Sequence, residues 1–263
     1  MRTYLLALIA STGCTFVSPP EGGDLGGGAD DEPTTGPAQQ PGPTPAARGA
    51  CDGADTSLRL CVDFDGAVVD LSASGAEIAA TSVGTMDRDG DPAGALSAAS
   101  TMHVHEAAAL DLQGGLALDM WIRPSGKPAT GARYWMLDNN QQYGASYTDA
   151  GTVRCVLASY TADSPVLALD GKFHHVACTY DRTRLKVFVD GDVARCLDLS
   201  IAIPTTGTDG LAIGANLSGT DAAPVFNDSF VGGLDDVRVW ARADLDVCAA
   251  AGRTGCRTSC DGL

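Results

Sequence analysis

The chain has 263 residues, 44% of them hydrophobic, and its 17 basic and 33 acidic residues give a formal net charge of −16 at pH 7. A surface this acidic repels phosphate backbones and anionic lipid headgroups. We therefore expect no nucleic-acid partner and no membrane adhesion through the folded part itself. The hydrophobic content suffices for a substantial core, and the length fits one β-sandwich domain better than two domains.

Residues 1–13 have the features of a signal peptide. Arg2 supplies a positive charge, and Tyr4 to Ala10 form an apolar run that is too short to span a bilayer. Small residues follow and lead directly into Cys14. The sequence therefore predicts an exported protein.

The run Ser11-Thr-Gly-Cys14 resembles a bacterial lipobox, although Ser11 stands where that motif usually has Leu. The resemblance implies that Cys14 is acylated and becomes the mature N-terminus. Thr15 follows the cysteine instead of Asp, which for such lipoproteins implies the outer membrane or cell surface, with the lipid anchor as the only membrane contact. The alternative is an ordinary signal peptide with an incidental cysteine.

Residues 14–50 are predicted to be the acylated cysteine followed by a disordered tether. The segment repeats Pro, Gly, Ala and Gln and has almost no large apolar side chains, so it cannot bury enough surface to offset its ordering entropy. Flexible-coil scaling gives it an average span of roughly 30 to 35 Å. Residues 51–263 then form the one folded domain.

Eight cysteines remain once Cys14 is set aside, and an even number in an exported domain predicts disulfides. Eight cysteines allow 105 pairings, so the sequence does not give the connectivity. A zinc site is the competing interpretation, but it would need paired C-x-x-C knuckles, which the sequence lacks. The predicted disulfide cysteines are Cys51, Cys61, Cys155, Cys178, Cys196, Cys248, Cys256 and Cys260.

From residue 58 onward the apolar residues alternate with period two, which is typical of half-buried strands. Residues 58–64 and 116–122 show this pattern, and Pro124 ends the second run. Residues 174–180 and 185–189 are rich in β-formers and are separated by four residues, which predicts a hairpin. Residues 246–251 could form one helical turn. The pattern predicts an all-β sandwich or barrel of short antiparallel strands.

Three stretches together resemble the laminin-G-like, concanavalin-A-like jelly-roll family: Leu116–Pro124, Gly171–Gly191 and Phe230–Arg242. The first has the form LALDMWIRP, the second begins GKFHHVACTYD, and the third contains LDDVRVW. The resemblance covers roughly residues 58–245. It implies a two-sheet antiparallel jelly-roll β-sandwich, with six or seven strands in each sheet and a ligand site at one rim or on the concave face.

The family resemblance also suggests one Ca²⁺, because such domains often hold this ion among Asp carboxylates in loops. We expect Asp70, Asp235 and Asp236 to contribute, together with Asp89 from the run Asp87-Arg-Asp-Gly-Asp. That run lacks the bidentate Glu of an EF-hand. The alternative is that these aspartates only cap turns.

The four histidines raise the possibility of a transition-metal site. His174 and His175 belong to the hairpin motif, and His103 and His105 have no obvious carboxylate or thiolate partner. We therefore expect structural or solvated roles for all four.

Catalysis is not expected. A glycosidase needs two carboxylates placed across the scissile bond, and neither Glu77 nor Glu106 lies in such a pattern. The most promising binding residues are Trp135, Asn140, Gln142 and Tyr143, because aromatic faces stack on sugar rings and amides bond to hydroxyls. Alternation equally favours Trp135 as a core residue.

The leading hypothesis is a tethered, non-catalytic cell-surface module that binds or adheres to a glycan or a protein. The rival hypothesis is a purely structural envelope protein or accessory subunit without a soluble ligand of its own. A glycan hydrolase would require two facing carboxylates in a groove.

Overall fold

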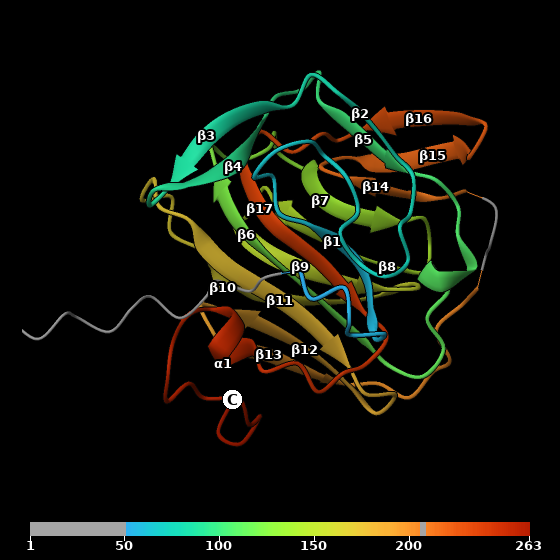
Figure 1. Ribbon diagram of the computed structural model, residues 1–263. Coiled ribbons are helices and arrows are strands. Elements are labelled where there is room, and N and C mark those ends of the chain that lie inside the picture. Colours follow the sequence, from blue (N-terminus) through green and yellow to red (C-terminus); the bar gives the residue numbers. More distant parts are fainter. Residues whose placement is uncertain (1–50, 206–208) are drawn as a thin grey trace, which may run out of the picture. The chain divides into compact units, whose positions relative to one another are not determined.

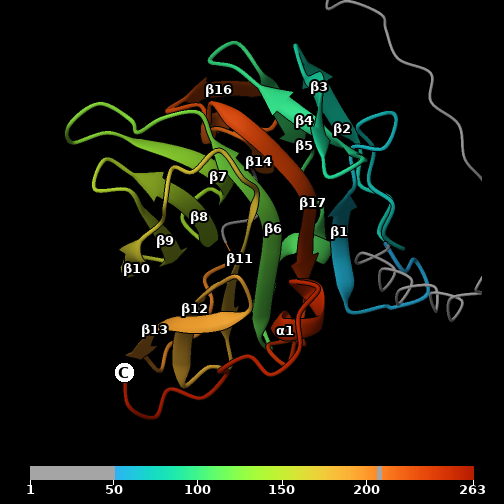
Figure 2. The same ribbon diagram turned by 90° about the vertical axis from the view of Figure 1, so that its left-hand side faces the viewer.

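The computed structural model describes residues 51–205 and 209–263, and these residues form an all-β sandwich (Figures 1 and 2). The predicted signal peptide, the acylated Cys14 and the tether lie outside the described residues. Within the described part of the chain, no helix is long and apolar enough to cross a membrane.

Seventeen strands, one 3₁₀ turn and one short helix make up the domain. In chain order they are β1 Leu58–Val62, β2 Ile78–Thr81, β3 Gly84–Arg88, β4 Asp91–Leu96, β5 Thr101–Val104, η1 Ala108–Leu110, β6 Leu116–Pro124, β7 Arg133–Asn139, β8 Tyr143–Thr148, β9 Thr152–Leu157, β10 Tyr160–Val166, β11 His174–Tyr180, β12 Arg184–Val189, β13 Asp192–Asp198, β14 Leu211–Ile213, β15 Asn216–Thr220, β16 Ala223–Asn227, β17 Gly232–Trp240 and α1 Val247–Ala250.

The strands form two antiparallel layers with the main core between them, as predicted. One sheet has eight strands in the order β13-β12-β11-β6-β17-β4-β3, with β1 also paired to β17. The other has seven strands in the order β10-β9-β8-β7-β14-β5-β2. A separate two-stranded hairpin, β15–β16, belongs to neither sheet, and the sequence did not predict it.

Side-chain alternation explains how each strand serves two environments. In β6, Leu118, Met120 and Ile122 enter the main core, whereas Asp119 and Trp121 point to the opposite side. We call the side of each sheet that is turned away from the main core its outer face. The outer faces of the two sheets carry most of the polar chemistry described below.

The predicted hairpin is present as β11 and β12, which pair from Val176↔Val189 to Tyr180↔Leu185. Its turn is held by Asp181, whose carboxylate accepts hydrogen bonds from the backbone N–H groups of Thr183 and Arg184 at 2.9 and 2.8 Å. The single helical turn, α1, is also present. The side chain of Asp246 caps it by accepting from the N–H of Ala249 at 3.0 Å.

All eight cysteines of residues 51–263 form disulfides, as predicted, and the structure supplies the pairing that the sequence left open. The pairs are Cys51–Cys61, Cys155–Cys178, Cys196–Cys260 and Cys248–Cys256. The second pair joins β9 of one sheet to β11 of the other through the core. The third and fourth fix the C-terminal segment, the third by joining it to β13.

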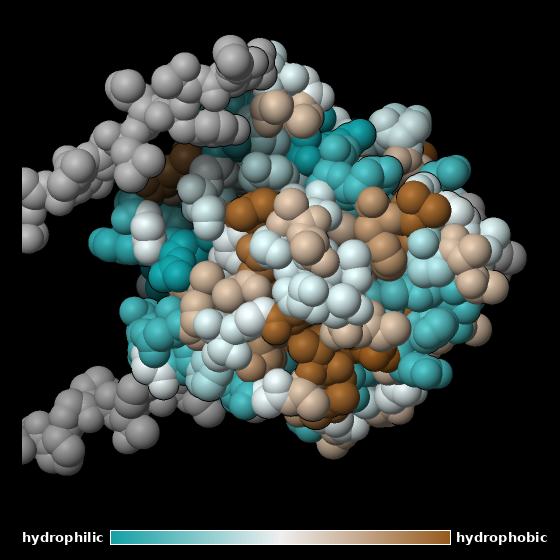
Figure 3. All heavy atoms as spheres, turned by 90° about the horizontal axis from the view of Figure 1, so that it is seen from above, coloured by the Kyte–Doolittle hydropathy of each residue, from teal (hydrophilic) through white to brown (hydrophobic). Residues whose placement is uncertain are grey.

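Large apolar side chains are mostly buried, but several remain exposed on the surface. Seen from above, apolar and polar residues are interspersed on one face of the molecule (Figure 3). The exposed large apolar residues are Val69, Leu71, Tyr160, Val166, Leu169, Val225 and Leu263. Val166 and Leu263 line the same hollow, and the others come from several loops and strands, so the set does not form one continuous docking surface.

Candidate functional site

A hollow of about 310 Å³ opens on the outer face of the seven-stranded sheet. It is built from β7, β8, β9 and β10, with one residue from the β15–β16 hairpin. Its lining residues are Arg133, Trp135, Asp138, Asn140, Gln141, Tyr143, Val156, Ala158, Ser159, Thr161 and Asn216.

The absence of a side chain at Gly144 makes room for the floor of this hollow. Gly144 lies on β8 between the core residues Tyr143 and Ala145, so it faces outward. A Cβ built on Gly144 would lie 2.8 Å from Cζ3 of Trp135 and 2.6 Å from the carbonyl oxygen of Leu137. Only glycine therefore lets the indole lie flat against the sheet.

Trp135 provides the aromatic surface of the floor. The guanidinium of Arg133 lies over the ring at 5.0 Å from its centroid, a cation–π contact that fixes the indole plane. The indole Nε1 is buried and has no hydrogen-bond partner within residues 51–205 and 209–263. A buried donor without an acceptor is costly, and it marks a position where a ligand oxygen would be favoured.

Asp138 is the carboxylate of the hollow. It is 4% exposed, and its Oδ2 accepts a hydrogen bond from the backbone N–H of Leu217 at 2.8 Å. Burial raises the pKa of Asp138 to about 6, against the opposing effects of the Leu217 N–H and the Arg133 charge. The side chain is thus an acceptor that titrates just below neutral pH.

Three of the four predicted ligand residues line the hollow, and the fourth does not. Asn140 lies at its edge and donates to Asp209 at 2.7 Å. Gln142 is buried and donates instead to Asp111 at 2.7 Å. Its role is to hold the β7–β8 turn against the chain that precedes β6.

Tyr143 reaches the hollow, but its ring belongs to the main core. The side chain is 1% exposed, and its hydroxyl donates to the carbonyl of Leu110 at 3.0 Å. Burial raises its pKa above the usual range of tyrosine. The ring therefore offers no free surface for stacking, and Trp135, at 6% exposure, offers only a narrow edge to the hollow.

The four predicted calcium ligands are not brought together. Asp70 caps its own loop, because its two carboxylate oxygens accept from the backbone N–H groups of Cys61, Ser72 and Ala76 at 2.8 to 2.9 Å. Asp89 forms the β3–β4 turn with Gly90, and both have positive φ, as a two-residue Asp-Gly hairpin requires. These two residues follow the turn-capping alternative.

Asp235 and Asp236 surround Arg88 on the eight-stranded sheet. Arg88 Nε lies 2.7 Å from Asp235 Oδ2, and Arg88 Nη2 lies 2.8 Å from Asp236 Oδ2. The guanidinium also covers the ring of Trp121 at 4.8 Å. Burial and the adjacent Asp236 raise the pKa of Asp235, while Arg88 opposes the shift. A cation at this position would have to compete with Arg88.

A second buried network on the same outer face surrounds Asp119. Its carboxylate, with 0% exposure, accepts hydrogen bonds from Arg238, from the indole N–H of Trp240 at 3.1 Å and from His175 Nε2 at 3.1 Å. Burial opposes ionisation of Asp119, but Arg238 and His175 outweigh it and lower its pKa to about 2. His175 thus has the structural role that the sequence predicted.

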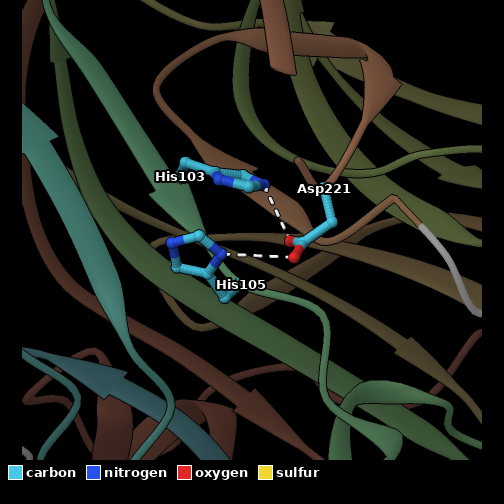
Figure 4. A group of neighbouring side chains, drawn as sticks. All are labelled: His103, His105 and Asp221. Carbon is cyan, nitrogen blue, oxygen red and sulfur yellow. Dashed lines mark hydrogen bonds and ion pairs between the residues drawn. The ribbon is translucent and has the colours of Figure 1, made fainter. Parts of the chain in front are cut away.

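The expectation that His103 and His105 lack a carboxylate partner is wrong. Asp221, which lies 116 residues after His105, approaches both rings (Figure 4). Within residues 51–205 and 209–263 these three form the only group of three or more His, Cys, Asp or Glu side chains whose ligand atoms lie within 4.8 Å of one another. The contact is made by the turn of the unpredicted β15–β16 hairpin.

The comparisons with known proteins agree with this fold. A family model described as the concanavalin A-like lectin/glucanases superfamily matches residues 96–244. No curated protein is similar enough to count as a relative.

Three solved structures share the fold at low sequence identity. The binding domain of Paraclostridial Mosquitocidal Protein 1 has a TM-score of 0.58 and 14% identity over 74% of this chain and 51% of that one. Domain 4 of AbnA, an extracellular arabinanase from Geobacillus stearothermophilus, was solved with arabinotriose. It has a TM-score of 0.55 and 15% sequence identity, and the match covers 74% of this chain and 97% of that one.

The third structure is of botulinum neurotoxin type C, described as entering cells through two ganglioside molecules. It has a TM-score of 0.54 and 13% sequence identity, and the match covers 74% of this chain and 50% of that one. This chain thus spans about half the length of the two toxin chains. At these identities the likeness concerns the fold alone. The family match covers more than half of the 263 residues, and the chain belongs to the concanavalin A-like lectin/glucanases superfamily.

Proposed function

We propose that the domain is a non-catalytic binding module that recognises a glycan in the hollow above Trp135. The observation that carries this proposal is the buried indole N–H of Trp135, which has no acceptor among the described residues although it lies in the wall of an open hollow. A sugar hydroxyl would supply the missing acceptor, and the carboxylate of Asp138 would accept from a second hydroxyl.

The composition of the hollow favours a polar, ring-shaped ligand. Its wall combines two largely buried aromatic rings with amides, hydroxyls, one guanidinium and one carboxylate. Its volume of about 310 Å³ lies at the lower end of the range found for small-ligand sites. The ligand-bearing arabinanase domain and the ganglioside-dependent neurotoxin, which share the fold, support this class of ligand.

The same hollow argues against hydrolysis. Among its lining residues Asp138 is the only carboxylate, whereas a glycosidase places two carboxyl groups across the bond that it cleaves. A protein partner is the second candidate, because a botulinum neurotoxin binding domain of the same fold was solved in complex with rat synaptotagmin II.

The proposal includes display at the cell surface. In this scheme Cys14 carries the lipid anchor, the segment up to residue 50 is the tether, and the domain reaches out from the outer membrane. The acidic composition supports a partner other than nucleic acid. Labelling with a radioactive fatty acid should mark the wild-type protein and leave Cys14→Ser unlabelled. Equal labelling of both proteins would contradict a lipid anchor on Cys14.

One bound Ca²⁺ also remains a proposal, at Asp235 and Asp236. Asp65 and Asp91 were not predicted as ligands but lie close to this pair. Burial, followed by the charges of Asp63, Asp91 and Asp236, raises the pKa of Asp65. This crowding of carboxylates supports the proposal. A calorimetric titration with Ca²⁺ that gives no heat, together with no rise in melting temperature, would contradict calcium binding.

The binding proposal is tested by a glycan array probed with the purified protein. Trp135→Phe keeps an aromatic ring but removes the N–H, and we expect it to weaken the strongest glycan signal about tenfold, the effect of one lost hydrogen bond in a desolvated site. Trp121→Phe, on the outer face of the other sheet, is the matched control and should bind like the wild type. An array without any specific signal, or equal loss in both variants, would contradict glycan recognition here.

A further inference from the structure

The cluster of His103, His105 and Asp221 lies where two segments distant in sequence meet. His103 is on β5 and His105 directly follows that strand, so their spacing of two places both rings on the outer face of the seven-stranded sheet. Asp221 occupies the turn between β15 and β16. Both imidazoles point one ring nitrogen at the Asp221 carboxylate (Figure 4).

The spacing of the donor atoms matches that of ligands around one metal ion. His103 Nε2 lies 3.3 Å from Asp221 Oδ1, and His105 Nδ1 lies 3.2 Å from Asp221 Oδ2. Ligands held 2.0–2.1 Å from a tetrahedral Zn²⁺ are about 3.3 Å apart. With one ligand atom taken from each residue, the three ligand atoms lie within 4.8 Å of one another, close enough to share one ion.

Hydrogen bonding alone does not account for His103. His103 is only 3% exposed, yet its Nε2 makes no hydrogen bond within residues 51–205 and 209–263. An orphaned imidazole nitrogen that points at a carboxylate is an unused ligand atom. By contrast, His105 Nδ1 hydrogen-bonds to Asp221.

The neighbouring backbone keeps this space open and orients the carboxylate. The N–H of Glu106 donates to Asp221 Oδ1 at 2.8 Å, and the N–H of Gly210 donates to Glu106 Oε2 at 3.1 Å. A Cβ on Gly210 would lie 2.7 Å from His103 Nε2 and 2.9 Å from Asp221 Oδ1. Any other residue at position 210 would fill the gap between the two ligand atoms. Supporting hydrogen bonds of this kind are typical around metal ligands.

Access to the cluster also suits a metal. His105 and Asp221 are 38% and 31% exposed, which leaves one side of the cluster open to solvent.

We propose that His103, His105 and Asp221 bind one transition-metal ion of the Zn²⁺ class, which joins the tip of the β15–β16 hairpin to β5. Two imidazoles and one carboxylate favour such ions over Ca²⁺ and Mg²⁺, which prefer oxygen ligands. Three protein ligands leave the fourth position of a tetrahedral ion for water on the exposed side.

The metal would also stabilise one wall of the hollow. The hairpin that it joins to β5 carries Asn216, which lines the hollow, and Leu217, whose N–H bonds to Asp138. The ion therefore fixes the position of the hairpin without contributing to the hollow itself. The metal site does not depend on glycan recognition, so either proposal can fail while the other stands.

Calorimetric titration of the metal-stripped protein with ZnCl₂ alone tests the site. We expect one ion per chain, with a Kd at least about tenfold weaker in His105→Ala and in Asp221→Asn, because each removes one ligand. Asp221→Asn keeps an oxygen that can accept from Glu106, and His105 is partly exposed, so both variants should fold. The heat of CaCl₂ addition should be the same in the wild type, His105→Ala and Asp221→Asn, because two imidazoles and one carboxylate do not favour Ca²⁺.

The matched control is His174→Ala. His174 also lies between two carboxylates, with Asp190 at 2.9 Å and Asp170 at 3.2 Å, but these contact opposite nitrogens of its ring and cannot share an ion with it. This variant should bind Zn²⁺ like the wild type. Hydrogen exchange of residues 216–227 should slow upon Zn²⁺ addition in the wild type but not in Asp221→Asn. Equal affinity in all variants, or no heat with the wild type, would overturn the proposal.

Discussion

Two buried sites, one on the outer face of each sheet, treat their polar groups in opposite ways. On the eight-stranded sheet, Asp119 is surrounded by Arg238, His175 and the N–H of Trp240, and its pKa is held at about 2. On the seven-stranded sheet, the N–H of Trp135 lacks an acceptor among the described residues, and burial raises the pKa of Asp138 to about 6. The Asp119 carboxylate is paired within the protein and supports the fold. Trp135 and Asp138 keep polar groups available, as expected of a binding surface.

The largest expected effect comes from opening the closed network. Asp119→Asn keeps the shape of the side chain but leaves the buried Arg238 without its nearest counter-charge. We expect the free energy of unfolding to fall by about 3 kcal/mol or more, as for other broken buried ion pairs. Denaturant unfolding at pH 7 measures this loss. A change of less than about 1 kcal/mol would show that the two faces do not differ as described.

The next effect concerns the pH dependence of stability. The pKa of Asp138 is raised from 3.8 to about 6 in the folded protein, so the folded state binds this proton more tightly than the unfolded state. Its contribution is present below pH 4 and is lost as the pH rises through 6, with an upper limit of about 3 kcal/mol. Asp138→Asn should remove this decline between pH 4 and 7. An unchanged pH profile of unfolding in the variant would contradict the raised pKa.

The smallest effect is a contrast between two tryptophans. Trp240→Phe should cost about 1 to 3 kcal/mol because it removes a donor from the buried Asp119. Trp135→Phe removes a donor without an acceptor and should change the free energy of unfolding by less than about 0.5 kcal/mol. Parallel thermal and denaturant unfolding of the two variants measures the difference. Equal losses would mean that the Trp135 N–H is already satisfied in solution.

The fold could be predicted from the sequence because its signals are local. Two of these signals span only a few residues: the alternation in residues 116–124 and the short spacing between 174–180 and 185–189. The third, the even number of cysteines, needs only the composition. The disulfide pairs needed the structure, since Cys196 and Cys260 are 64 residues apart. The hairpin of residues 216–227 was missed because its Asn, Ser, Gly and Thr residues give only a weak strand signal.

The sites depended on contacts that no local pattern contains. Trp135, Asn140 and Tyr143, which the sequence singles out because an aromatic residue near amides is visible there, all line the hollow, and their role in binding stays a prediction. Asp138 and Asn216 meet only through the hydrogen bonding of separate strands. The contact of Asp221 with His105 spans 116 residues, and the sequence spacing of the two histidines alone favoured a structural role.

The Cys155–Cys178 disulfide has a mechanical consequence for the hollow. It covalently joins the two layers in the middle of the core, so the small sliding motions by which packed layers usually adjust are prevented there. The β15–β16 hairpin is hydrogen-bonded as a ladder of its own and is not subject to that restraint. We therefore expect adjustment of the hollow to ligands of different size to come from this hairpin, and bound Zn²⁺ to restrict that adjustment.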